Sequence, residues 1–150
     1  MFLEKDKKVE NIFKIVLLIV ILTTNGLYGN YAFKKKVKNV CASYRIDVDA
    51  ASFDFDETFF SMSLESGRNN FEMFMIVGFA ASGQAVSHQQ ELGLSNAYMP
   101  ENIQVTVNVP SSKGEVNTFV ATCSSKTAIK LADGEIDSSE FMQIITLKII

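Results

Sequence analysis

The stretch Met73-Phe74-Met75-Ile76-Val77-Gly78-Phe79-Ala80-Ala81 is the most apolar segment after the N-terminal region of this 150-residue chain. As one helix it begins after an N-cap at Asn70 and ends at Gly93, a typical C-terminal stop. The alternative is a buried strand at 72–77 followed by a helix at 80–92. Small residues would let a neighbouring element pack closely against the helix: Gly78, Ala81 and Ala85. Both interpretations bury the apolar part of this segment in the core.

Segments on both sides of this helix alternate apolar and polar residues, which is the period of half-buried strands. Ile103–Val109 has the clearest alternation, and Val116–Cys123 returns as its hairpin partner, with Phe119 and Cys123 facing inward. Before the helix, the alternation runs through Tyr44–Val48 and again through Phe53–Phe59. A short turn between these two runs predicts a second hairpin, with a bulge where the apolar phase changes near Phe59.

The C-terminal third predicts a short helix over 127–132, capped by Ser125, and then a final segment over 141–150. Asp137 and Glu140 have the spacing of a capping box at the start of that segment. Its β-branched tail also fits an edge strand. The fold class expected is α+β: an antiparallel sheet of four or five strands, a central packed helix and a shorter C-terminal helix.

The apolar run Ile15–Leu22 follows a lysine-containing start and has the length of a signal-peptide core, well short of a membrane span. Residues 1–32 are therefore expected to be a signal peptide, residues 33–40 a basic linker, and residues 41–150 a single domain. The protein would be secreted or periplasmic. Positive charge after the run hinders translocation, so the alternative is an uncleaved membrane anchor over residues 12–33. The small residues at which a signal peptidase would act are Gly26, Gly29 and Ala32.

Charge is distributed unevenly along the chain. Eight of the fourteen Lys and Arg residues lie at or before Lys38, whereas from Asn39 onward six basic residues face fourteen acidic ones. A body with that balance repels nucleic acid, which is excluded as a partner. The lysines at 34–38 suit either a solvated linker or contact with anionic lipid.

The chain has two cysteines, Cys41 and Cys123. In an exported protein they are expected to form a disulfide bond that closes a long loop. The alternative is a pair of unpaired buried thiols, which applies if the domain faces the cytosol.

Four carboxylates are expected to gather on the outer side of the first hairpin, where Asp49 would lie opposite Asp54: Asp47, Asp49, Asp54 and Asp56. Like charges facing each other in a sheet repel, so they are either solvated or bridged by a divalent cation. Oxygen ligands of this kind suit calcium or magnesium.

The segment 133–140 resembles the second half of an EF-hand calcium loop, with Asp133, Asp137 and Glu140 at ligand positions. Two earlier ligand positions hold Ile129 and Leu131, which cannot bind a metal ion. A turn followed by a capped helix explains the same residues.

His88 is the only histidine, so multi-histidine metal sites are excluded and any Ser-His-Asp triad would use it. No G-x-S-x-G motif accompanies it. The function expected is therefore a non-catalytic binding or structural role in an exported domain, with an unidentified protein or small ligand as partner and a weak calcium site as an option. A membrane is expected as partner only through an uncleaved N-terminal segment. The competing hypothesis is a small exported hydrolase that uses His88 or the four aspartates.

Overall fold

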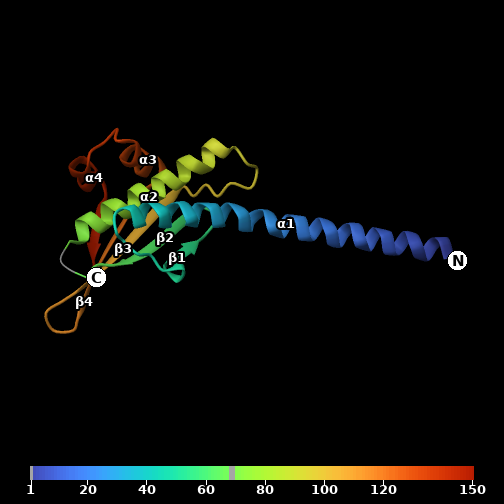
Figure 1. Ribbon diagram of the computed structural model, residues 1–150, viewed down its shortest axis with the longest axis horizontal. Helices are drawn as coiled ribbons and strands as arrows, with labels where there is room; N and C mark the ends of the chain where they lie inside the picture. Colours follow the sequence, from blue (N-terminus) through green and yellow to red (C-terminus); the bar gives the residue numbers. More distant parts are fainter. Residues whose placement is uncertain (1, 68–69) are drawn as a thin grey trace.

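The computed structural model describes residues 2–67 and 70–150, with side chains for 5–17, 29–49, 51–67 and 70–150. Figure 1 shows a long helix that runs along a compact body and then projects far beyond it. In chain order the elements are α1 (Phe2–Ser43), η1 (Ala50–Ser52), β1 (Phe53–Phe55), β2 (Phe59–Glu65), α2 (Phe71–Leu92), β3 (Asn102–Pro110), β4 (Val116–Ser124), α3 (Ser125–Asp133), α4 (Ser138–Ile144) and β5 (Thr146–Ile149).

The five strands form one mixed sheet in the order β1-β2-β3-β4-β5. The α+β class is confirmed, but the expectation of a purely antiparallel sheet is wrong, because β2 and β3 run parallel with Leu64 opposite Val107. The reason is the connection between them. Helix α2 carries the chain back along the sheet before β3 begins, and such a crossover joins parallel strands.

The central helix is a single helix from Phe71 to Leu92, as the first of the two interpretations predicts. It ends at Gly93 in the left-handed conformation, with φ 58°. A Cβ atom on Gly78 would lie 2.8 Å from Cγ1 of Val105, so this glycine lets α2 approach β3 closely. Helix α2 lies between α1 and α3 on the buried face of the sheet (Figure 1).

Helix α1 joins the body from Gly29 onward, where one of its faces becomes buried. The ring of Phe33 is fully buried and meets the rings of Phe55, Phe60 and Tyr98 at centroid distances of 6.0, 4.8 and 5.0 Å. Val37 is also fully buried. Residues 33–40, expected to be a basic linker, are therefore the part of α1 that packs on the sheet, because three-to-four residue spacing places their apolar side chains on one face.

The N-terminal half of α1 extends away from the body (Figure 1). The side chains of residues 18–28 lie outside the described part, and with them most of the predicted signal core and the Gly26 cleavage position. Within the part of the chain that the structure describes, no helix has both the length and the apolar character needed to cross a membrane.

The predicted hairpin before the central helix is wrong in its first strand. Helix α1 continues to Ser43, and Arg45, with φ 60°, ends it in the left-handed conformation while Ile46 donates its N–H to the carbonyl oxygen of Cys41 at 3.0 Å. The hairpin forms instead between β1 and β2, with Asp54 opposite Ser61. The change of apolar phase near Phe59 thus arises from a turn and not from a bulge. Ser66, Gly67 and Asn70 are typical turn residues and predict a turn over 66–70, which includes residues 68–69 outside the described part of the chain.

The C-terminal elements follow the sequence pattern, except that the N-cap of α3 is Ser124, whose hydroxyl oxygen accepts the N–H of Thr127, and not Ser125 as expected. Ile103 to Val109 and Val116 to Cys123 form the expected antiparallel hairpin, with Phe119 on its buried face. Asp137 and Glu140 form the predicted capping box at the start of α4. The chain then finishes as edge strand β5, which pairs with β4.

Candidate functional site

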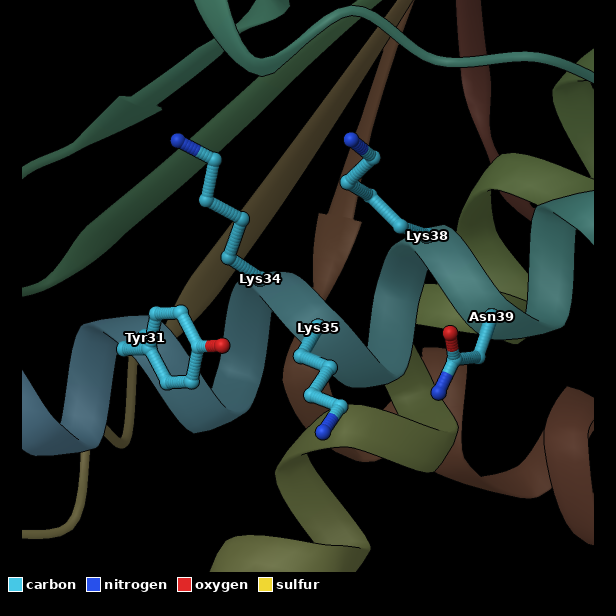
Figure 2. Close-up of a pocket in the computed structure, with 5 residues that line it drawn as sticks. All are labelled: Tyr31, Lys34, Lys35, Lys38 and Asn39. Atoms are coloured by element: carbon cyan, nitrogen blue, oxygen red, sulfur yellow. The ribbon is translucent and has the colours of Figure 1, made fainter.

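One exposed side of α1 carries a shallow basic hollow of about 330 Å³. We call it the basic cradle, and its lining residues are Tyr31, Lys34, Lys35, Lys38 and Asn39. Figure 2 shows Lys34 and Lys38 on one side of the helix and Lys35 and Asn39 on the other. Three lysines therefore line one hollow, their ammonium groups extend to two sides of the helix, and the exposed ring of Tyr31 lies at its end.

The lysines of the cradle are not neutralised by neighbouring acids. In the part of the chain with described side chains, no carboxylate lies within salt-bridge distance of them, and the one ion pair is between Lys14 and Glu10 at 2.6 Å. The Nζ atom of Lys34 lies 5.8 Å from the centre of the Phe53 ring, a cation–π contact that leaves its charge in place. Because the chain from Asn39 onward carries fourteen acidic residues against six basic ones, the cradle is a local positive surface beside an acidic body.

Large apolar side chains are exposed on the projecting half of α1. We call five of them the apolar stripe; their exposed fractions run from 51% to 68%, and they are Val9, Ile12, Phe13, Val16 and Leu17. Their spacing of three and four residues places them on one side of the helix. Ile15, on another side of the helix, is exposed as well.

The apolar stripe and the basic cradle face the same direction. Phe13, Val16 and Leu17 each precede a cradle residue, Tyr31, Lys34 and Lys35 respectively, by 18 positions in one unbroken helix. Eighteen residues make about five whole turns of an α-helix and about 27 Å of its length. The lipophilic and cationic surfaces of α1 therefore form one line along the helix, on the side away from buried residues such as Phe33.

The four aspartates of the predicted cation cluster are not arranged as expected. Asp54 lies on β1, whereas Asp47 and Asp49 lie in the irregular segment before η1, where Asp49 accepts a hydrogen bond from the N–H of Ala51 at 3.1 Å. Across the described residues, no group of three or more His, Cys, Asp or Glu side chains is placed to hold a metal ion. A cation site at Asp47, Asp49, Asp54 and Asp56 stays a prediction without a geometric basis.

The residues that resemble part of an EF-hand loop have structural partners. Asp137 accepts the N–H of Glu140 at 2.8 Å, and a carboxylate oxygen of Glu140 accepts the N–H of Asp137 at 3.3 Å. Asp133 is the last residue of α3, before Gly134 with φ 75°. The turn followed by a capped helix therefore accounts for this stretch.

His88 lines a polar hollow of about 250 Å³ where three helices meet. Its neighbours there include Lys36 of α1, Ser87 and Glu91 of α2, and Asp133 of α3. Ser87 and His88 are adjacent on the helix, so their side chains point in different directions. No hydrogen bond joins His88 to a hydroxyl or carboxylate within the described side chains, and the arrangement is not that of a catalytic triad.

The two cysteines are buried and free, so the expected disulfide between Cys41 and Cys123 is not formed. Cys41 lies near the end of α1, whereas Cys123 lies in β4. The thiol of Cys123 forms a hydrogen bond with the backbone of Ala128 in α3. Burial raises the pKa of the Cys41 thiol to about 11 and that of Cys123 to about 12. Both thiols are therefore protonated and unreactive at neutral pH.

Sequence patterns alone predict that the lysines at 34–38 belong to a linker. They do not reveal that these lysines lie on the same side of one helix as the apolar stripe. The signal that reveals it is the 18-residue spacing, which has meaning only if one helix runs through both segments. No family model matches this chain, and neither the curated proteins nor the solved structures include a significant match.

Proposed function

We propose that this protein is a non-catalytic binding or structural component of the cell envelope that attaches to a lipid surface through α1. The observation that carries the proposal is the apolar stripe, which projects beyond the body with half or more of each side chain exposed. Exposed apolar side chains at helical spacing are typical of a segment that another apolar phase covers.

The packing of α1 supports retention of the N-terminal segment. Cleavage after Ala32 would leave Phe33, whose ring is fully buried among other aromatic rings, as the first residue of the chain. It would also remove Gly29, which lies so close to the backbone of Asn96 that a Cβ atom there would overlap its carbonyl oxygen. A signal peptide that ends inside a packed helix would weaken the attachment of that helix, so we favour the retained segment over the cleaved one.

The lipid contact can be tested with a fluorescent reporter, because the chain contains no tryptophan. In full-length Phe13→Trp, we expect a blue shift and protection from aqueous quenchers when phosphatidylcholine vesicles are added. Tyr44→Trp, at an exposed position on another side of the chain, is the matched control and should not respond. An unchanged emission spectrum of Phe13→Trp, together with concentration-dependent self-association without lipid, would assign the stripe to a second copy and contradict the proposal.

Substitutions that place charged residues in the apolar stripe test whether its apolar character is needed for lipid binding. Ile12→Asp with Val16→Asp should abolish co-sedimentation with vesicles, since both side chains belong to the stripe. Val116→Asp with Ile149→Asp makes the same changes at exposed apolar positions of the body and should leave sedimentation unchanged. Intact mass of the protein from its native cells decides whether the segment is retained: a chain that begins after Gly26, Gly29 or Ala32 would contradict retention.

A further inference from the structure

We infer that the basic cradle of α1 binds the phosphate groups of anionic lipids and thereby sets how the body stands on the membrane. The inference rests on the proposed function and names the chemistry of the surface that α1 meets. Lys34, Lys35 and Lys38 line one open hollow, and no described carboxylate lies within salt-bridge distance of their ammonium groups. Such a cluster is complementary to phosphate oxygens at a headgroup surface.

The register of α1 selects a lipid surface over an isolated anion. The cradle faces the same direction as the apolar stripe, about five helical turns away, so both reach a flat surface when α1 lies along it. The stripe then enters the acyl boundary while the lysines remain among the headgroups. A site for a free anion would need no apolar surface in line with it.

Tyr31 lies at the end of the cradle nearer the apolar stripe, on the same side of α1, and is 64% exposed. A tyrosine has an apolar ring and a polar hydroxyl, a combination that favours the boundary between acyl chains and headgroups. Along one side of α1 the order is thus apolar residues, an interfacial aromatic ring and then cations.

The acidic body fixes the orientation. Helix α1 buries Phe33 and Val37 against the body on the side away from the cradle, so a helix lying on lipid holds the body above it. From Asn39 onward the chain carries an excess of eight negative charges, which an anionic surface repels. Attraction at the cradle and repulsion of the body therefore favour a single orientation.

The test measures binding of the full chain to two kinds of vesicle, phosphatidylcholine alone and phosphatidylcholine mixed with phosphatidylglycerol. We expect tighter binding to the anionic vesicles. Lys34→Gln with Lys35→Gln and Lys38→Gln should weaken that binding about 100-fold, to the neutral-vesicle level, because each lysine near an anionic surface contributes about fivefold. Replacing the same three lysines by arginine should preserve it.

A matched control separates the cradle from net charge. Lys113→Gln with Lys126→Gln and Lys148→Gln removes three exposed lysines from the body and should leave binding to both vesicles unchanged. An equal loss in this control would overturn the inference. Raising ionic strength from about 0.1 M to about 1 M should remove only the anionic preference of the native chain.

The remaining outcomes distinguish this inference from the proposed function. Equal binding to both vesicles overturns the cradle and leaves attachment through the apolar stripe standing. Absence of binding to either vesicle overturns both. If inorganic phosphate competes much better than chloride at matched ionic strength, the cradle is a site for a free anion, and the lipid inference fails.

Discussion

The ring of Phe33 in α1 lies 4.8 Å from the ring of Phe60 in β2, centroid to centroid, with the two planes inclined by 67°. Both side chains are fully buried. An edge-to-face pair of this kind stabilises beyond the burial of its area. This contact holds the long helix on the sheet, and therefore positions everything that α1 presents outside the body.

Removal of that ring should be among the most damaging single changes in the chain. Phe33→Ala is expected to lower the free energy of unfolding by about 3–5 kcal/mol, because it leaves a cavity among aromatic rings. Chemical denaturation of the full chain followed by circular dichroism measures this. Tyr31→Ala, two residues away on the exposed side, should change it by less than about 0.5 kcal/mol. Similar losses for both variants would show that α1 is not held by its buried face.

Gly83 of α2 permits close contact with α3, since a Cβ atom there would overlap the carbonyl oxygen of Ala128. Gly83→Ala should destabilise by about 1–3 kcal/mol through overpacking. Helix propensity alone predicts the opposite sign, a gain of about 1 kcal/mol. Thermal unfolding decides between them, with Gly67→Ala as a control where the added methyl group meets open space.

The two buried thiols make stability depend on pH. Burial raises the pKa of Cys41 to about 11 and of Cys123 to about 12, from an ordinary value of 9.0. Above about pH 9 the unfolded chain loses thiol protons that the folded chain retains, so the free energy of unfolding should fall. The slope is at most about 1.4 kcal/mol per pH unit for each thiol. Urea titrations between about pH 8 and pH 10 measure it.

The double variant Cys41→Ala with Cys123→Ala provides the control, and its slope over the same range should be smaller. Native protein should also resist a thiol-alkylating reagent, whereas protein denatured without reductant should take up one alkyl group at each cysteine. Alkylation that requires prior reduction would instead establish the disulfide bond.

The capping box of α4 should contribute measurably despite its exposure. Asp137→Ala removes the acceptor of the Glu140 N–H and is expected to lower the free energy of unfolding by about 1 kcal/mol. Ser139→Ala changes an exposed residue in the same turn and should have little effect. Added calcium should not alter the difference between the variants, because the carboxylate of Asp137 serves the helix. A calcium-dependent gain lost in Asp137→Ala would reinstate the EF-hand interpretation.

Local patterns predicted much of the body correctly because short-range physics decides them. Alternation at Ile103–Val109 and Val116–Cys123 reflects one solvent-exposed and one buried face of each strand, and both strands form as expected. Gly93 and Gly134 end helices with positive φ, a conformation that glycine adopts without strain. The capping box at Asp137 involves residues three positions apart and needs no tertiary context.

Tertiary structure alone decided three features. Tyr44–Val48 alternates like a strand but forms none. Helix α1 instead continues to Ser43, because Val37, Val40 and Cys41 are buried against the body, a contact that the local pattern does not predict. The parallel pairing of β2 with β3 depends on where α2 returns the chain. Asp54 lies opposite Ser61 and not opposite Asp49, because β1 pairs with β2.

The candidate site shows the same division. The sequence by itself contains the apolar run, the lysines and their spacing, and composition determines that the body is acidic. The apolar stripe and the basic cradle are aligned because α1 is continuous through both. That side of the helix stays exposed because Phe33 is buried on the opposite side. A helix turns by a fixed angle per residue, so direction is encoded locally, but which side is covered depends on contacts with residues far away in the chain.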